Sequence, residues 1–435
     1  MKLLADLSPL RESPPFRRLW AGSTLSLTGS ALTRFAVVLQ VYDTTRSTAA
    51  VGLIGLAVMV PLLVVGLLGG ALIDTADRRM LVLASTAGNM VVAAAIAAQA
   101  YLHLRQVWPL FLLLAAQSAI SGINEPARRA LIPALLSGDQ LAAGLALQRL
   151  TGQITLIAGP ALAGVIVATP HLGLGGCYLI DTASFTAALY GTWRLPRVRG
   201  DKSNSPERAR LSAVSAGFSF IWRTPVVAGA FIADVNATFF GLPTALFPAI
   251  NAERFGGDPR TLGLFTASIG VGGLIAAVLS GPVRHVSRQG LAMLVTVTIW
   301  GAGFAVFAVA PWLWLTLLSL GIAGAADTGT VVLRGLIVQT VTPDEFRGRV
   351  TAADYAVGAG GGQLGSLESG VLGSLTTPEI SALSGGLLTI VGAVVIGAAL
   401  PAFARYRAPA AGAGTGQQDT PLGGSEHLAD VEPGG

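Results

Sequence analysis

Charge is scarce in this chain: only 12% of its 435 residues are Asp, Glu, Lys or Arg, whereas 52% are hydrophobic. Soluble domains carry about 25% charged residues, so an ordinary soluble globular fold is excluded. The apolar residues form separate blocks of about 20 residues, the length at which a helix crosses the hydrocarbon of a bilayer. The short alternating strands of a membrane barrel are missing. We therefore expect an all-α membrane protein.

Cysteine and histidine are scarce as well. The single Cys177 excludes an internal disulfide, and four scattered histidines offer no metal-ligand spacing, so we expect no metal site. The chain has no G-x-x-x-x-G-K-[ST] loop for ATP and no catalytic motif of a soluble enzyme. We expect no enzymatic activity, no catalytic residue and no cofactor.

The apolar blocks predict twelve transmembrane helices. The expected spans are residues 17–42, 49–73, 80–103, 107–127, 141–168, 173–194, 226–250, 261–283, 290–310, 312–334, 350–374 and 383–403. Residues 1–16 contain too short an apolar run for a cleavable signal, so the first span is expected to remain.

The basic residues predict the orientation. With the N-terminus inside, most Lys and Arg side chains lie in cytoplasmic segments, and only Arg46, Arg105, Arg254 and Arg260 fall outside. An even number of spans places both termini in the cytoplasm and the protein in the inner (plasma) membrane. The same bias explains the net charge of +5, so we expect no nucleic-acid partner.

An internal repeat divides the chain into two halves. "RALIPALLSGDQLAAGL" from Arg129 aligns with "RGLIVQTVTPDEFRGRV" from Arg334, and each copy links a fourth helix to a fifth. Duplicated six-helix halves are typical of transporters. The predicted parts are a cytoplasmic N-terminal segment (1–16), a six-helix half (17–194), a cytoplasmic linker with a surface helix (195–225), a second six-helix half (226–403) and a disordered cytoplasmic tail (404–435).

The stretch "GGALIDTADRR" carries a loop motif. Gly70, Leu72, Asp74, Arg78 and Arg79 match G-x-L-x-D-x-x-G-R-K, with Asp77 in place of the second glycine. On this motif the chain resembles the major facilitator superfamily. The resemblance implies twelve helices in two pseudo-symmetric halves, with a substrate path between them.

Further motifs narrow the resemblance. "GPALAG" in the fifth span resembles the antiporter motif G-P-x-x-G-G through Gly159, Pro160 and Gly164. Segments such as "EPARRALIP", "GLPTALFPAI" and "GGGQLGSLESG" are similar to the enterobactin (siderophore) exporter and macrolide-efflux branch. This resemblance implies export. From the residues alone, Gly and Pro at this spacing favour close helix packing and a bend.

The resemblance also implies a conformational latch on the cytoplasmic face, formed when the cavity faces outward. Its predicted residues are Gly70, Asp74, Asp77, Arg78, Arg79, Arg128, Arg347 and Arg349, with Arg128 pairing with an acid of the motif. The alternative is that the arginines only set the topology.

Charged and polar residues inside the spans are costly, and we expect them to face a cavity or a partner. The candidates for proton coupling or substrate binding are Arg34, Glu125, Asp234, Asn236, Asp327 and Glu368. Asp234 and Asp327 are the favoured coupling acids, while Arg34 is expected to hold an anionic substrate or tune the acids. Glu125 lies one turn from Arg128 and Arg129, which favours a fixed ion pair.

The resulting functional hypothesis is a monomeric secondary transporter, powered by the proton gradient, that exports a small amphipathic molecule such as a siderophore or drug. Proton-coupled uptake is one alternative. A non-transporting membrane scaffold or sensor with the same fold is another, although a scaffold has little need of so many buried charges.

Overall fold

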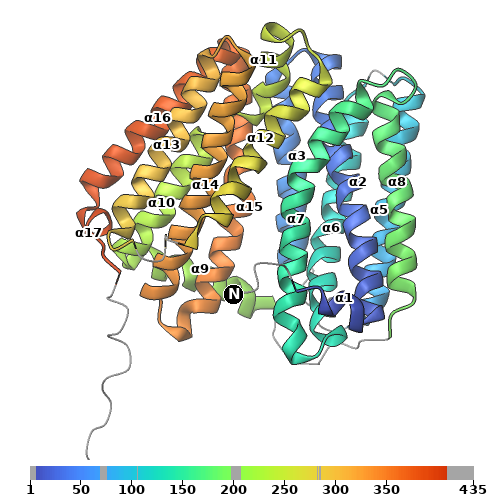
Figure 1. Cartoon of the computed structure of the whole chain (residues 1–435), viewed down its shortest axis with the longest axis horizontal. Helices are drawn as coiled ribbons and strands as arrows, with labels where there is room; N and C mark the ends of the chain where they lie inside the picture. The colour runs from blue at the N-terminus through green and yellow to red at the C-terminus, as the bar shows by residue number, and fades with distance from the viewer. Residues whose placement is uncertain are drawn as a thin grey trace, which may run out of the picture.

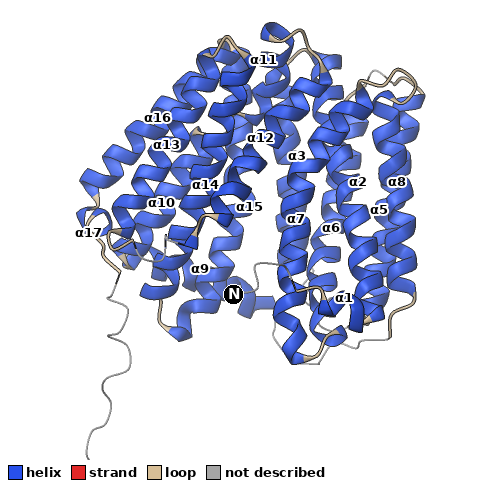
Figure 2. Cartoon of the chain, viewed as in Figure 1, coloured by secondary structure: helices blue, strands red, loops and turns tan. Residues whose placement is uncertain are grey.

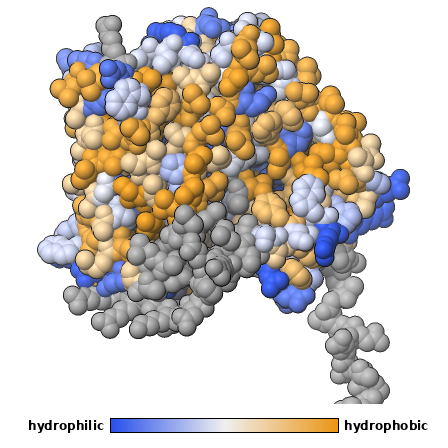
Figure 3. All heavy atoms as spheres, turned by 180° about the vertical axis from the view of Figure 1, so that it is seen from behind, coloured by the Kyte–Doolittle hydropathy of each residue, from blue (hydrophilic) through white to orange (hydrophobic). Residues whose placement is uncertain are grey.

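The computed structural model describes residues 6–68, 76–104, 106–196, 207–281, 283 and 286–408. Throughout these residues the secondary structure is helical, with turns and loops but no strand (Figure 2). The prediction of an all-α protein is therefore confirmed. Apolar residues cover the body of the molecule and hydrophilic residues gather toward its two ends (Figure 3), as expected for a protein surrounded by lipid.

The described residues of the first half form the helices α1 (Ser8–Glu12), α2 (Pro14–Thr45), α3 (Thr48–Leu68), α5 (Arg78–Tyr101), α6 (Trp108–Leu135), α7 (Gly138–Val167) and α8 (Gly173–Trp193). The second half contains α9 (Glu207–Arg223), α10 (Pro225–Phe240), the short 3-10 helix η1 (Thr244–Leu246), α11 (Phe247–Arg254), α12 (Pro259–Val278), α13 (Gln289–Val309), α14 (Leu313–Val341), α15 (Asp344–Leu375), α16 (Pro378–Ala399) and α17 (Pro401–Ala404).

Nine helical segments of the described residues are long and apolar enough to cross a membrane. The prediction of a multi-helix membrane fold is thus confirmed, while the count of twelve stays a prediction. Three further long helices, α6, α8 and α15, are not among these nine segments. Polar residues interrupt their apolar stretches, such as Gln117 and Asn124 in α6, Asp181 in α8, and Gln363 and Glu368 in α15.

The seventh predicted span departs from a continuous helix. α10 ends at Phe240, and the chain passes through residues 241–243 and η1 before α11 begins at Phe247. Gly241 and Pro243 explain the interruption, because glycine weakens a helix and proline lacks the backbone donor that a helix needs. The inner and outer parts of this span are therefore separate elements.

Figure 1 shows two helical halves side by side, joined near one end of the molecule. We call this end, which carries α11, the α11 end, and the opposite one, which carries α1 and α9, the α9 end. The two halves meet along two helix pairs, α7 with α12 and α3 with α15. Both pairs approach most closely where glycines lie, since a helix without a side chain at the contact lets a second backbone come near.

Glycine contacts define this seam. A Cβ atom added to Gly164 of α7 would lie 2.5 Å from the carbonyl oxygen of Pro259 in α12, and one added to Gly263 would lie 2.5 Å from the carbonyl oxygen of Pro160. In the other pair, Thr48 Oγ1 donates a hydrogen bond to the carbonyl oxygen of Gly370 at 2.8 Å. The seam therefore closes the space between the halves at the α11 end.

Arg254 anchors α11 to the second half. Its guanidinium donates hydrogen bonds to the carbonyl oxygens of Phe307, Ala308 and Ala310 at the end of α13, at 2.7–3.1 Å, and forms an ion pair with Glu379 of α16 at 3.3 Å. The cation satisfies carbonyls that have no partner within their own helix.

We expect Arg254→Met to lower the thermal stability of the protein, because unsatisfied buried acceptors cost about 1–3 kcal/mol. The apparent melting temperature in detergent, followed by size-exclusion chromatography after heating, measures the effect. Arg260→Met, which removes an exposed arginine at the same end, is the control. Equal melting temperatures for both variants would show that α11 is held by apolar packing instead.

Candidate functional site

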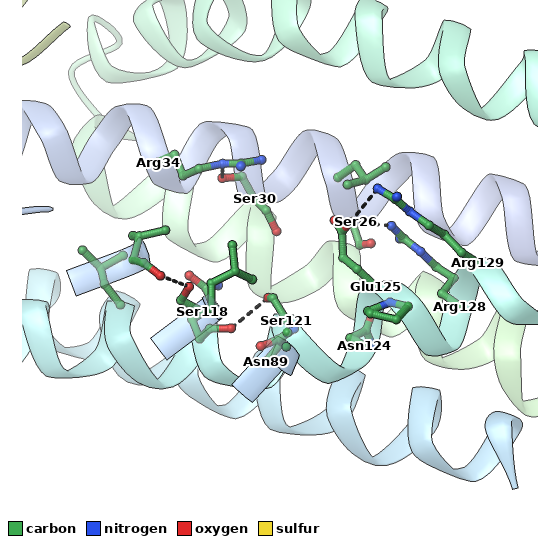
Figure 4. Close-up of a pocket in the computed structure, with 18 of the residues that line it drawn as sticks. Ser26, Ser30, Arg34, Asn89, Ser118, Ser121, Asn124, Glu125, Arg128 and Arg129 are labelled. Atoms are coloured by element: carbon green, nitrogen blue, oxygen red, sulfur yellow. Dashed lines mark hydrogen bonds and ion pairs between the residues drawn. The ribbon is translucent and has the colours of Figure 1, made fainter. Parts of the chain in front are cut away.

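A cavity of about 370 Å³ lies in the first half, on the face turned toward the second. It extends from the middle of α2 toward the α9 end, so the seam lies at the opposite side. Its polar lining consists of Ser26, Ser30, Arg34, Asn89, Gln117, Ser118, Ser121, Asn124, Glu125, Arg128 and Arg129. Figure 4 shows Arg34 and Ser30 of α2 across the cavity from the serines and Glu125 of α6. Hydroxyls, amides and charged groups make up its polar part, and apolar side chains such as Val58, Leu114 and Phe185 line the rest.

Arg34 is exposed to this cavity. Its Nε donates a hydrogen bond to the carbonyl oxygen of Ser30 at 3.3 Å, and among the described residues it has no ion-pair partner within 4.0 Å. The terminal nitrogens of the guanidinium are thus available to a bound molecule. Asp181 lies near enough to interact electrostatically with Arg34, but no carboxylate occupies its terminal nitrogens among the described residues. A cavity arginine of this kind favours an anionic group, because arginine presents several donors in a plane.

Asp181 of α8 lies behind Arg34. Its carboxylate is fully buried and accepts hydrogen bonds from Thr33 Oγ1 at 2.7 Å and Ser30 Oγ at 3.2 Å. Both donors belong to α2, so this acid ties α8 to α2. Asp181 itself is not among the residues that line the cavity.

Glu125 lines the cavity, and its carboxylate is already paired with two arginines of the same helix. One carboxylate oxygen lies 3.2 Å from Arg129 and the other 3.8 Å from Arg128 (Figure 4). These pairs are one turn apart on α6, the spacing at which opposite charges meet on a helix. Arg128 therefore faces Glu125, and its predicted pairing with an acid of the loop motif stays a prediction because Asp74 lies outside the described residues. The net lining is cationic, with three arginines to one glutamate.

A second group of charges lies in the other half. Arg334 Nη1 of α14 is 2.5 Å from Asp234 Oδ2 of α10 and 3.3 Å from Asp354 Oδ1 of α15. Asp327, two turns before Arg334, interacts electrostatically with both Asp234 and Arg334. The guanidinium also lies over the ring of Phe231, 5.7 Å from its centre. We call Asp234, Asp327, Arg334 and Asp354 the acid cluster.

Among the described residues the acid cluster contains more acids than cations. Asp234 and Asp354 lie within 4.0 Å of the Arg334 guanidinium, and Asp327 interacts with it electrostatically. The side chain of Asp234 is only 7% exposed and that of Arg334 only 11%. Charges removed from water are costly unless each has a partner. An uncompensated carboxyl group in such surroundings is suited to gain and lose a proton.

The charged candidates named from the sequence lie in two separate places. Arg34 and Glu125 line the cavity, whereas Asp234 and Asp327 are not among its lining residues. α10, which carries Asp234, packs against α14 and α15. A shared role of the four residues in substrate binding or proton coupling stays a prediction.

The remaining polar candidates lie elsewhere. Asn236 donates a hydrogen bond to the carbonyl oxygen of Thr389 at 2.9 Å and so joins α10 to α16. Glu368 is half-buried on α15 and does not line the 370 Å³ cavity. A substrate role for either residue stays a prediction.

The antiporter-like motif is a packing element at the seam. A Cβ on Gly159 would lie 2.5 Å from that of Ala31 in α2, while Gly164 and Pro160 face α12, as described above. The motif thus joins α7 to its own half and to the other half at once. Its link to export stays a prediction.

The predicted latch is only partly within the described residues, since Gly70 and Asp74 lie outside them. Asp77 begins α5 by accepting a hydrogen bond from the backbone N–H of Arg79 at 2.9 Å. Arg78 donates to the carbonyl oxygen of Ala130, and Arg79 to that of Trp193. These contacts hold neighbouring helix ends of one half together.

The arginines of the second half lie at the same end of the molecule. Arg347 pairs with Asp344 at 2.7 Å, and Arg349 lies over the ring of Phe346, 5.2 Å from its centre. Neither contact crosses to the first half. The latch stays a prediction for the conformation in which the α9 end is closed.

Sequence reasoning missed Asp354 and Tyr355. Asp354 belongs to the acid cluster, and Tyr355 is the residue through which α15 contributes to the cavity lining. Both lie in "TAADYAVGAG", which carries no motif. A signal existed, since Asp354 is an acid inside a predicted span, but its pairing with Arg334 depends on how α14 and α15 pack.

Comparison with known proteins places the chain in a family. A family model described as "transmembrane secretion effector" matches residues 4–412. The enterobactin exporter EntS of Citrobacter koseri is 28% identical over 93% of this chain and 96% of that protein. The enterobactin exporter EntS of Shigella boydii is 27% identical over 90% of this chain and 94% of that protein.

Solved structures share the fold. The nucleoside transporter NupG, as its D323A mutant, superimposes with a TM-score of 0.71 at 15% identity, covering 88% of this chain and 99% of that chain. A bacterial homologue of the human lysosomal transporter Spinster gives a TM-score of 0.70 at 13% identity, covering 92% and 99%. At this identity the likeness shows the fold alone, and it confirms the predicted major facilitator fold.

Proposed function

The chain belongs to the transmembrane secretion effector family of membrane transporters, and we propose that it is a proton-coupled exporter of a small amphipathic molecule that works by alternating access. The observation that carries the proposal is the separation of two charged sites. A cationic, hydroxyl-rich cavity lies in one half, and an acid cluster with more carboxyl groups than cations lies in the other.

The cavity is placed to load a substrate from the cytoplasm, as export requires, and the names of the relatives supply the direction. Because basic residues gather at the α9 end, we assign this end and both termini to the cytoplasm. The halves are joined at the α11 end, so the cavity can receive a molecule from the cytoplasmic side. The relatives are named enterobactin exporters, which makes a siderophore the first substrate to test.

In this proposal the proton gradient supplies the energy for export, and neither ATP nor a cofactor is needed. A carboxyl group of the acid cluster takes up a proton where the proton concentration is high and releases it on the cytoplasmic side. Asp234 and Asp327 are the coupling acids that we propose. The protein functions as a monomer in the inner (plasma) membrane, because each half of one chain contributes one of the two sites.

The test uses the purified full-length protein in proteoliposomes, with enterobactin as the siderophore probe and ethidium as the drug probe. We expect an inward proton gradient to drive at least one probe in the opposite direction. Movement of the probe in the same direction as the protons would indicate uptake. Transport that ignores the proton gradient would contradict proton coupling, and no transport of either probe would favour the scaffold alternative.

Arg34 gives a prediction about substrate charge. We expect Arg34→Gln to raise KM about tenfold to a hundredfold for transported compounds that carry a negative charge, because a charge-assisted hydrogen bond contributes about 1.5–3 kcal/mol. Arg34→Lys keeps the charge but loses the planar donors. Its KM for these compounds should lie between that of the unmodified protein and that of Arg34→Gln. Initial transport rates over a series of anionic and neutral probes measure the effect.

Arg129→Gln is the matched comparison, because Arg129 lines the same cavity but is already paired with Glu125. Its loss should change KM less than the loss of Arg34. If Arg34→Gln altered neutral and anionic compounds equally, Arg34 would shape the cavity rather than bind an anion.

A further inference from the structure

Asp181 of α8 is a charged side chain that belongs neither to the cavity lining nor to the acid cluster. It is 0% exposed, and among the described residues no cation lies within 4.0 Å of its carboxylate. A carboxylate removed from water is costly unless other groups offset its charge. The groups that surround Asp181 therefore decide what its charge can do.

Two hydroxyl groups hold the carboxylate against one turn of α2. Ser30 Oγ donates to Oδ1 at 3.2 Å and Thr33 Oγ1 donates to Oδ2 at 2.7 Å, so both oxygens accept hydrogen bonds, as those of an ionised carboxyl group do. A Cβ atom added to Gly29 would lie 2.8 Å from both Oδ1 and Cα of Asp181. The two helices are thus in close contact here, and the charge is fixed in place.

The same turn of α2 carries Arg34. This arginine directly follows Thr33, and its Nε donates a hydrogen bond to the carbonyl oxygen of Ser30 at 3.3 Å. Ser30 therefore contacts the acid with its hydroxyl group and the arginine with its carbonyl oxygen. Ser30 and Arg34 both line the cavity (Figure 4), and Arg34 is the cation that interacts electrostatically with Asp181. A negative charge behind the cavity wall thus faces a positive charge within it.

Other charged groups near these helices have different partners or none in Asp181. α8 packs against α2, α5 and α7, and none of the charged residues of α5 and α7 is hydrogen-bonded or ion-paired to Asp181 in the described structure: Arg78, Arg79, Asp139 and Arg149. Glu125, the acid of the cavity lining, is paired with Arg128 and Arg129. Asp181 is thus the acid whose charge is available to Arg34.

From these contacts we propose that Asp181 is the fixed counter-charge of Arg34 and sets how strongly the cavity attracts an anionic group. Arg34 would contact the anion, whereas Asp181 acts through Arg34 and is a positioning residue. A negative charge behind a cation weakens the attraction of that cation for a second anion, and the effect is large where water is excluded. The anion is then held loosely enough to be released, which transport requires as much as binding.

This inference rests on the proposed function only for the identity of the bound molecule, because the charge pairing can be measured without a substrate. The test probes the purified full-length protein at low ionic strength and about pH 8, above the range in which carboxyl groups usually titrate. Ser121→Cys introduces a thiol in the cavity lining, and the native Cys177 is buried and can remain. The reaction rates of this thiol with sulfonatoethyl methanethiosulfonate, an anion, and trimethylammonioethyl methanethiosulfonate, a cation, are compared.

Asp181→Asn is expected to raise the ratio of the anionic to the cationic rate about tenfold, because the positive potential of Arg34 is no longer offset. Asp181→Ser should do the same without an amide, which guards against a variant that fails to fold. Arg34→Gln should lower the ratio. Thr33→Val is the matched control, since it removes a hydrogen bond between the same two helices but keeps the carboxylate, and its ratio should match that of the parent protein.

An unchanged ratio in both Asp181→Asn and Asp181→Ser, or an equal rise in Thr33→Val, would overturn the assignment of Asp181 as a counter-charge. For transported anionic compounds we expect Asp181→Asn to lower both KM and kcat, because a more tightly held anion leaves more slowly, with neutral compounds unaffected. If the ratio of rates changed as expected but KM for anionic compounds did not depend on Arg34, the proposed use of the cavity would be wrong and the charge pairing would stand. The two failures are therefore distinguishable.

Discussion

Asp234→Asn is expected to reduce proton-driven export to the background of protein-free vesicles. The substitution keeps the shape of the side chain but removes the charge that lies 2.5 Å from Arg334. Breaking a buried ion pair costs about 3–5 kcal/mol, and we expect a smaller loss of stability here because Asp354 still faces Arg334. Transport should therefore fail in a protein that remains folded.

The measurement compares gradient-driven efflux with exchange of labelled and unlabelled probe in the absence of a gradient. A coupling residue should affect the first much more than the second, since exchange moves no net proton. Asp327→Asn should show the same pattern, and Glu345→Gln, which neutralises an exposed acid of α15, should show neither effect. Unchanged efflux in both Asp234→Asn and Asp327→Asn would contradict the assignment of the coupling acids.

Gly164→Val is expected to abolish transport by preventing closure of the seam. Even a single Cβ at this position would lie 2.5 Å from the carbonyl oxygen of Pro259 and 3.1 Å from Cα of Arg260, and backbone atoms cannot move aside as a flexible side chain can. Overpacking of a tight contact costs about 1–3 kcal/mol, which shifts a balance between two conformations by about fivefold to more than a hundredfold.

Gly152→Val is the matched control, because this glycine lies on the same helix and a Cβ there would meet no atom within 4 Å. Introduced cysteines at Thr169 and Arg260 can report closure of the α11 end through the rate of cross-linking. We expect cross-linking to slow in Gly164→Val and not in Gly152→Val. Normal transport by Gly164→Val would show that the seam can separate or slide without loss of function.

Much of the fold could be predicted from the sequence because a bilayer restricts the possible structures. Apolar blocks near 20 residues in length indicate spanning helices, and polar residues indicate the segments between them. The interruption at residues 241–243 was harder to predict, although Gly241 and Pro243 lie there. Hydropathy averages over such a short break, so the seventh span resembled one helix.

The candidate site was less predictable because ion pairs depend on helix rotation and packing. The pairing of Glu125 with Arg129 followed from spacing within one helix. The pairing of Asp234 with Arg334 joins residues 100 positions apart, and no pattern within either segment specifies it. Asp354 was missed for the same reason, since its partner is on another helix.

The placement of the two charged sites in different halves has an evolutionary consequence. In the proposed function, the cavity of the first half selects the substrate and the acid cluster of the second half couples transport to the proton gradient. Mutations can therefore change substrate selection without changing proton coupling. Relatives with different substrates can then keep the same proton-coupling residues. New specificities would arise by change among cavity residues such as Ser118 and Asn124, with Arg334 and its acids left intact.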